Sequence, residues 1–247
     1  MIKTRLQSLR FREVQAYRNL AIVPLLSAAY GKCKYLTLGE ALAHWNIAVT
    51  EASAGGTMPE LLVVNRGDQP VLLIDGEELS GAKQNRGLNS SILLKECSKT
   101  RIPVSSTEQG RRSHTSRSFQ ESGNVMARTI RARKARSVSA SLDQSASFFS
   151  DQREDWDGIA ELQSKACAPS PTSAMSDVFN AREHDLHQCV RTFKLFANQV
   201  GLLAVTDGKA VGLDLVSFSG AYAKLHPKLI RSYALESLLE PAGNLIT

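Results

Sequence analysis

Six short apolar runs of strand length lie within the first 106 residues, and this pattern most constrains the fold. They occupy residues 21–26, 47–52, 60–65, 71–75, 91–94 and 101–106. Apolar runs of this length, bounded by turn residues, predict β-strands. Because helical segments do not alternate regularly with these runs, a doubly wound parallel sheet is not expected. The sequence predicts an α+β fold, with a largely antiparallel β-sheet flanked by helices in a single domain.

Four segments have the periodicity or the capping residues of helices: 37–45, 151–166, 181–199 and 226–239. In the first of them, Thr37 and Glu40 have the spacing of a capping box. Two hairpins are also expected. Residues 66–69 (RGDQ) would join the third and fourth strand runs, and Asp207-Gly208 would turn a second hairpin near the C-terminus.

The middle of the chain, at about residues 109–150, is rich in Ser, Arg and Gly. Much of it lacks clear periodicity. Residues 124–137 could form a helix, whereas the serine-rich residues 137–150 are predicted to be a mobile loop.

Composition narrows the class of protein. The 247 residues carry a net charge of +6, which favours anionic partners. The four cysteines are far apart and form no CxxC pair, so neither a disulfide framework nor a zinc knuckle is expected. The best apolar run, residues 21–30, contains Pro24 and is shorter than the ~20 residues that span a membrane. We expect a soluble, cytoplasmic protein that makes no membrane contact.

Residues 76–93 (GEELSGAKQNRGLNSSIL) follow directly after the run 71–75 and mix many long polar side chains. They include Glu77, Glu78, Lys83, Gln84, Asn85, Arg86 and Asn89. The carboxylates could act as general bases, hold a metal or accept ribose hydroxyls. The lysine and arginine can neutralise phosphate, and the amides offer both donors and acceptors to a polar ligand. The alternative is a solvated loop, since three glycines in this stretch allow turns.

Several blocks of the sequence resemble a known family. GEELSGAKQNR, SSIL and IPVSSTEQGR are followed much later by QVGLLAVTDGKAVGLDL and SYALESLL. In this order they resemble the ARG and rhodanese-phosphatase-superfamily-associated protein domain, where ARG denotes ADP-ribosylglycohydrolase. The resemblance runs from about residue 19 to residue 239. It implies a prokaryotic domain connected, through its genomic neighbours, with NAD-utilising or ADP-ribose-related metabolism.

The positions that match the family motif are Glu77, Glu78, Gly81, Lys83, Gln84, Asn85, Arg86, Glu108, Gly110, Arg111 and Asp214. Two positions depart from the family's VSC-x-E-x-GRW pattern: Ser106 replaces the cysteine and Arg112 replaces the tryptophan. A thiol nucleophile is therefore excluded at that position. Glu108 and Arg111 could add a carboxylate and a phosphate contact if their strand adjoins residues 76–89. The alternative is a surface ion pair, which stabilises little.

Three further features have two interpretations each. Asp214 lies between apolar neighbours, so it either has a buried partner or faces a cleft, unless it faces water on an edge strand. Residues 111–136 hold eight Lys or Arg and could bind nucleic acid, although a solvated helix face explains them too. His184 and His187 could share a metal on one helix face, but the HExxH spacing is missing.

The leading hypothesis is a polar cleft around residues 76–89 that binds or processes a phosphorylated ribose-type ligand. The catalytic candidates are Glu77, Glu78 and Glu108, and the ligand-binding candidates are Lys83, Gln84, Asn85, Arg86, Asn89, Arg111 and Asp214. Such a site could serve a hydrolase or a transferase, with a divalent cation as a possible cofactor. The alternative is a non-catalytic assembly module whose basic tract meets an acidic protein partner. A nucleic-acid binder that uses residues 111–136 is the third hypothesis.

Overall fold

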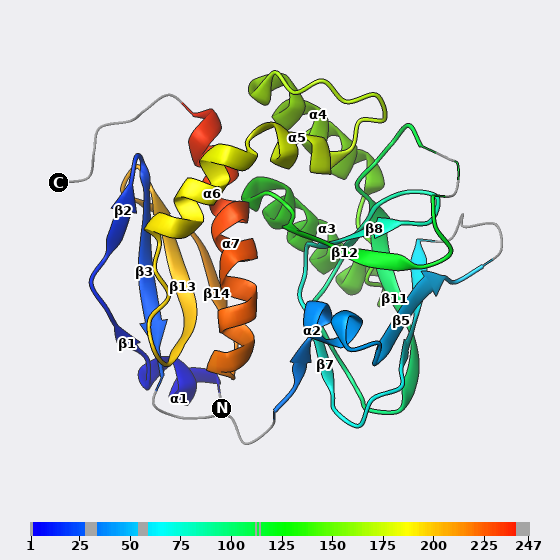
Figure 1. Cartoon of the computed structure of the whole chain (residues 1–247), viewed down its shortest axis with the longest axis horizontal. Helices are drawn as coiled ribbons and strands as arrows, with labels where there is room; N and C mark the ends of the chain where they lie inside the picture. The colour runs from blue at the N-terminus through cyan, green and yellow to red at the C-terminus, as the bar shows by residue number, and fades with distance from the viewer. Residues whose placement is uncertain (1, 28–33, 54–58, 112, 114, 241–247) are drawn as a thin grey trace. The chain divides into compact units, whose positions relative to one another are not determined.

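The computed structural model describes residues 2–27, 34–53, 59–111, 113 and 115–240. The chain forms two compact units (Figure 1). The terminal unit combines Met1–Lys34 with Glu183–Thr247, and the central unit is Tyr35–Arg182. Helices accompany mostly antiparallel sheets, so the predicted α+β class is confirmed. The prediction of a single domain stays a prediction, because compactness alone does not say whether each unit folds independently.

The central unit is built on a six-stranded antiparallel sheet in the order β12-β8-β9-β11-β6-β5. Its strands are β5 (Ile47–Glu51), β6 (Glu60–Asn65), β8 (Glu77–Gly81), β9 (Arg86–Leu88), β11 (Ser98–Ser106) and β12 (Phe119–Val125). The long strand β11 pairs with β6 along its first part and with β9 along its second. Because β12 and β5, at the two ends of this order, also contact each other, the sheet curls around its own inner face.

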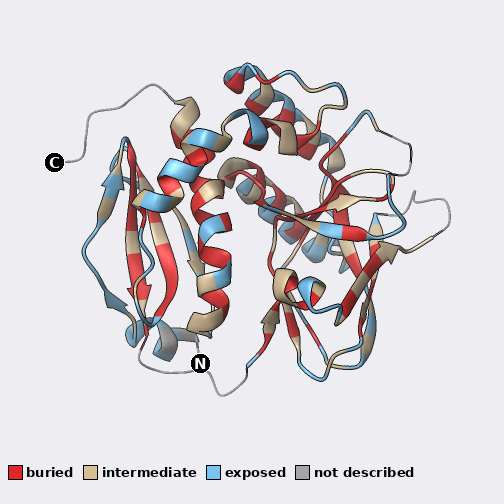
Figure 2. Cartoon of the chain, in the orientation of Figure 1, coloured by how far each residue is buried: buried red, intermediate tan, exposed pale blue. Residues whose placement is uncertain are grey.

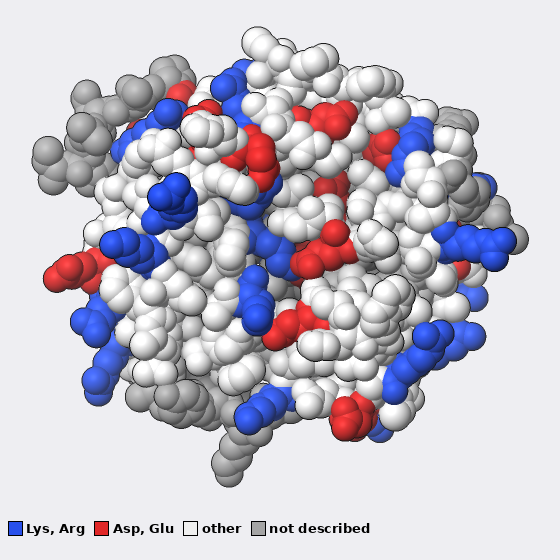
Figure 3. Space-filling view, viewed as in Figure 1, with Lys and Arg blue, Asp and Glu red and all other residues white. Residues whose placement is uncertain are grey.

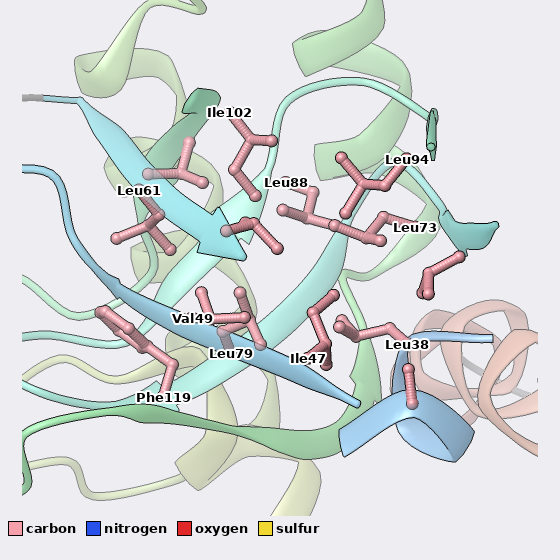
Figure 4. Packing of buried hydrophobic residues seen from close by; sticks show 14 of the residues in the cluster. Leu38, Ile47, Val49, Leu61, Leu73, Leu79, Leu88, Leu94, Ile102 and Phe119 are labelled. Carbon is pink, nitrogen blue, oxygen red and sulfur yellow. The ribbon is translucent and has the colours of Figure 1, made fainter. Parts of the chain in front are cut away.

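Apolar side chains fill the inside of this curl, as Figure 4 shows. Strands place alternate residues on opposite faces, so Val49, Leu79 and Leu88 point inward together. Figure 2 shows the same strands as largely buried. The alternation continues to the strand ends, where the next inward positions carry the charged residues Glu51 and Arg86.

A second sheet corrects the prediction of a hairpin through residues 66–69. It has the order β10-β7-β4, with β4 (Leu36–Thr37), β7 (Val71–Leu73) and β10 (Ile92–Leu94). The chain does turn after β6, where the Asn65 amide donates to the carbonyls of Gln69 and Lys95. However, β6 pairs with β5 and β11, whereas β7 pairs with β4 and β10. The turn signal was local, and tertiary contacts chose the partners.

The predicted capping box is confirmed in α2 (Leu38–Ala43), where Thr37 and Glu40 bond each other reciprocally. Three helices that follow α2 in the chain complete the central unit: α3 (Arg128–Ser145), α4 (Gln152–Ala166) and α5 (Met175–Ala181). Helix α4 was predicted, and α3 packs against it.

The loop predicted for residues 137–150 is wrong as far as Ser145, because α3 continues to that residue. Residues 124 and 125, expected to be helical, belong to β12. Serine usually disfavours helix interiors, but Ser139 and Ser145 donate to carbonyls four residues earlier in α3. Mobility of this region stays a prediction.

The terminal unit holds the other predicted hairpin, formed by β13 (Gln199–Thr206) and β14 (Lys209–Leu215). Asp207 and Gly208 both have positive φ, as an Asp-Gly turn requires. The remaining strands are β1 (Arg10–Phe11), β2 (Gln15–Tyr17) and β3 (Leu20–Leu26), and the helices are α1 (Ile2–Gln7), α6 (Glu183–Thr192) and α7 (Ser219–Leu239). Helix α6 is shorter than predicted and α7 is longer. Within the described ranges, no helix combines the length and apolarity needed to cross a membrane.

Candidate functional site

Residues 76–89, predicted to line a polar cleft, form the antiparallel pair β8–β9 and the turn 82–85 between them. Alternation along the strands divides the predicted residues between two faces. Glu77 and Arg86 lie on the apolar inner side, whereas Glu78 lies on the outer side. The stretch is therefore neither a solvated loop nor one continuous polar surface.

The two adjacent glutamates are buried in different surroundings. Glu77 is 1% exposed, and its carboxylate accepts the backbone N–H of Ile74 at 2.9 Å. Glu78 is fully buried; its Oε1 accepts the Thr107 hydroxyl at 2.7 Å, and its Oε2 has no hydrogen-bond donor in the part of the chain that the structure describes. Burial, aided by the charge of Glu108, raises the pKa of Glu78 to about 7, although side-chain interactions with Thr107, Ser122 and Asn124 oppose this rise. Glu78 therefore changes its protonation near neutral pH.

Glu108 and Arg111, predicted as further site residues, form a tightly bonded network with the turn 82–85. The Arg111 guanidinium contacts both Glu108 oxygens, with a shortest distance of 2.7 Å. It also donates to the carbonyl of Ala82 and to the side chain of Asn85. Glu108 accepts in addition from Thr172 Oγ1 and from the backbone N–H of Asn85. Burial acts to raise the pKa of Glu108, but these donors outweigh it and hold the pKa below its usual value.

This network fixes three segments of chain to one another. Gly110 N–H donates to the Thr172 carbonyl, and Met175 N–H donates to the Thr107 carbonyl. The loop before α5 is thereby joined to the end of β11 and to the turn 82–85. Since the Arg111 donors are largely occupied inside the protein, the geometry favours a structural role for Arg111 over phosphate binding. Its predicted ligand-binding role, like the catalytic role of Glu108, stays a prediction.

We expect the substitution Arg111→Ala to lower the free energy of unfolding by about 2 kcal/mol, because it leaves the buried Glu108 carboxylate without its charged donor. Chemical denaturation with urea measures the effect. Arg101→Ala is the matched control, since Arg101 makes only an exposed ion pair with Glu60 at 3.4 Å and should cost below ~1 kcal/mol. Equal effects of the two substitutions would contradict the structural role of Arg111.

Asn89 belongs to a different buried cluster, on the outer side of the sheet beneath α3 and α4. Its Oδ1 accepts from Ser105 Oγ at 2.8 Å and from Lys134 Nζ at 3.2 Å. Lys134 also pairs with Asp155 at 3.0 Å, and Ser150 joins Ser105 to Asp155. Burial lowers the pKa of Lys134, and the charge of Asp155 opposes this. The cluster connects the sheet, α3, α4 and the segment before α4.

Sequence analysis missed this cluster, although a signal was present. Lys134 lies four residues from each of Ile130 and Val138, both of which face the core. Asp155 occupies the core-facing stripe of α4 with Ile159. A charged residue at an apolar helical position indicates a buried partner. Lys134 was instead counted as part of the basic tract.

A pocket of about 680 Å³ opens where the curled sheet ends at β5. It is lined by Thr50, Glu51, Ala52, Ser53, Thr115, Ser116 and Arg117. The turn 82–85 borders it, because Ala82 N–H donates to Ser116 Oγ and Thr115 N–H donates to the Ala82 carbonyl. Lys83 and Gln84 are half-buried in this turn. Ligand sites often occupy such a position, at the open end of a curled sheet.

Glu51 and Arg86 form a loose ion pair beside this pocket. Their closest atoms are 3.8 Å apart, and their side chains are only 10% and 7% exposed. Among the described residues, neither carboxylate oxygen of Glu51 has a hydrogen-bond donor. Burial lowers the pKa of Arg86, whereas Glu51 opposes that shift. Sequence analysis missed Glu51, which was detectable as a charged residue that continues the inward positions of Ile47 and Val49.

Four of the eight basic residues in the tract 111–136 form ion pairs with acidic side chains. Arg111 pairs with Glu108, Arg131 with Asp75, Arg133 with Glu161 and Lys134 with Asp155. Figure 3 shows acidic side chains interspersed with basic ones on the face drawn. This geometry does not favour a continuous cationic surface for nucleic acid.

The remaining candidates lie in the terminal unit. Asp214, on β14, accepts the Tyr233 hydroxyl at 2.6 Å. Asp214 belongs to the terminal unit, whereas residues 76–89 belong to the central unit. The role of Asp214 at the site around residues 76–89 stays a prediction. His187 pairs with Glu183 at 2.8 Å. Across the part of the chain that is described, no group of three or more His, Cys, Asp or Glu side chains could hold a metal ion.

Residues 8–245 match the ARG and Rhodanese-Phosphatase-superfamily-associated Protein domain, ARPP-1. The chain belongs to the ARPP-1 family. The resemblance inferred from the GEELSGAKQNR block is thereby confirmed, and it extends over nearly the whole ARPP-1 chain. Comparison with curated proteins and with solved structures gave no match. Family membership therefore identifies the domain without assigning a ligand or a reaction.

Proposed function

We propose that this ARPP-1 domain binds a phosphorylated ribose-type small molecule in the pocket at the end of β5. The observation that carries the proposal is the pocket itself, whose volume of about 680 Å³ suits a small ligand. Its position supports the choice, because the turn 82–85 of the family motif borders it. The association of the family with ARG, which its name contains, favours a ribose-type ligand.

The pocket offers groups that suit a polar, anionic ligand. Arg117 is exposed at its rim and can contact phosphate in a bidentate manner. Thr50, Ser53, Thr115 and Ser116 also line the pocket, and the hydroxyls of Thr115 and Ser116 already make hydrogen bonds within the protein. Arg86 lies behind Glu51, and Lys83 lies in the bordering turn, so two of the predicted ligand-binding residues are near this pocket. The proposal assigns binding to this site and leaves chemistry at Glu77, Glu78 and Glu108 as a prediction.

A non-catalytic assembly module is the second candidate. The network of Glu108, Arg111 and Asn85 supports it, because these motif residues bond mainly to one another and to the backbone. In this case the motif would maintain the turn 82–85 and the loop before α5. The acidic partner expected at the basic tract is less favoured, since much of that tract is already paired with acids.

Thermal unfolding in the presence of ADP-ribose, NAD, AMP and ribose 5-phosphate tests the proposal. A ligand at ~100 times its dissociation constant should stabilise the fold by ~2.7 kcal/mol. We expect stabilisation by at least one of them and a clear loss of affinity in Arg117→Ala.

Arg101→Ala is the control for a lost positive charge, because Arg101 pairs with Glu60 and does not line the pocket. It should leave binding unchanged. If wild-type protein unfolds cooperatively and none of the four compounds stabilises it, the assembly module becomes the better explanation.

A further inference from the structure

The Glu51 carboxylate lacks the hydrogen bonds that a buried anion normally receives. Its side chain is 10% exposed, yet neither oxygen has a donor among the residues that the structure describes. Arg86 compensates part of the charge from 3.8 Å, which is longer than a hydrogen bond. A buried acceptor without a donor costs roughly 1–3 kcal/mol. Glu51 also lines the pocket, so a bound molecule can supply what the protein does not.

The surroundings of Glu51 limit the kind of group that fits. A cationic group is disfavoured, because Arg86 already places a positive charge beside the carboxylate. A metal site made of protein side chains alone is not supported, since the described residues contain no group of three or more His, Cys, Asp or Glu that could hold an ion. A neutral group with two hydrogen-bond donors remains, one for each oxygen of the carboxylate.

Two hydroxyls on adjacent carbons meet this requirement. Each hydroxyl donates one proton and also carries lone pairs. The pair can therefore donate one proton to each Glu51 oxygen from within the pocket, while Arg86 balances the charge of the carboxylate from 3.8 Å. A vicinal diol thus matches the two Glu51 oxygens, which accept no hydrogen bond from the described residues, and the ribose of the proposed ligand carries such a diol.

We propose that Glu51 is a specificity-determining residue that binds a vicinal diol of the ligand, with Arg86 positioned behind it. This inference rests on the proposed function, since it concerns the same pocket. It assigns the deep end of the pocket to the sugar hydroxyls and the rim at Arg117 to the anion.

Calorimetric titration with AMP, 2′-deoxyAMP and 3′-deoxyAMP tests the inference on the wild-type protein. We expect AMP to bind at least tenfold more tightly than either deoxynucleotide, because each of them leaves one Glu51 oxygen without a donor. Equal affinity for the three nucleotides would overturn the diol inference and leave the proposed function standing. Absence of binding by all three would overturn the inference together with nucleotide binding at this pocket.

The variant Glu51→Gln provides a second readout. It should lower the affinity for AMP to that for 2′-deoxyAMP while leaving the affinity for 2′-deoxyAMP nearly unchanged, which also shows that the pocket is intact. Glu60→Gln, on the neighbouring strand and outside the pocket, should keep the full preference for AMP. A preference that survives in Glu51→Gln would overturn the assignment to Glu51.

Discussion

Replacing Lys134 by methionine should lower the free energy of unfolding by about 4 kcal/mol, one of the largest effects expected in this protein. Lys134 and Asp155 are 2% and 1% exposed and pair at 3.0 Å. Methionine keeps much of the side-chain volume, so the loss comes from the Asp155 carboxylate, which would remain buried without its cation. The urea concentration at the midpoint of unfolding measures the effect.

Two further variants separate the ion pair from general damage to α3. The double substitution Lys134→Met with Asp155→Leu should recover most of the lost stability, because replacing both partners of a buried pair is often nearly neutral. Arg133→Ala, next to Lys134 but in an exposed pair with Glu161, should cost less than ~1 kcal/mol. A double variant as unstable as the single one would contradict the expectation that the unpaired charge causes the loss. It would show that the hydrogen bonds of Lys134 and Asp155 within the buried polar cluster cause it instead.

The substitution Glu78→Gln should stabilise the protein in a pH-dependent manner. Burial raises the pKa of Glu78 from 4.5 to about 7. Between these two values the folded protein binds the proton more tightly than the unfolded chain does, so the contribution of Glu78 to stability falls as pH rises and levels off above about pH 7. The full change is about 3 kcal/mol, at 1.36 kcal/mol for each pKa unit.

Glutamine does not titrate, so the difference in unfolding free energy between variant and wild type should grow by about 3 kcal/mol from pH 4.5 to pH 8. Denaturation series at several pH values in this window measure it. Glu60→Gln removes a carboxylate from an exposed ion pair with Arg101 and serves as the control. Parallel pH profiles for wild type and Glu78→Gln would contradict the raised pKa.

Residue type alone did not predict on which face of the sheet each polar side chain of residues 76–89 lies. The stretch 76–89 was expected to present its polar side chains to one cleft. In the structure the backbone alternation of β8 and β9 separates Glu77 and Arg86 from Glu78. Burial then gives Glu78 a carboxylate oxygen without a donor, while Glu108 receives donors from Arg111, Thr172 and Asn85. Identical side-chain chemistry therefore acquired different electrostatic properties from position alone.

Local sequence indicated several of the helices, strands and turns of this protein. Apolar runs set β5, β6 and β11, the capping residues Thr37 and Glu40 set the start of α2, and the Asp207-Gly208 turn set the late hairpin. These features depend on interactions between residues close in sequence, so their signals are visible without a structure. The ARPP-1 family was also indicated without a structure, because the GEELSGAKQNR block is a sequence motif of that family.

Only the tertiary structure decided which strands pair and which charges meet. The strand β6 joined β11 instead of β7, because pairing depends on packing between distant segments. The contact between β12 and β5 curled the sheet, and the pocket beside Glu51 lies where the curl ends. Glu51 and Arg86 are 35 positions apart in the sequence, and Lys134 meets Asn89 across 45. The core-facing position of a single charge, such as Lys134 or Glu51, can be detected locally, but its partner cannot, since only folding brings the two side chains together and removes them from water.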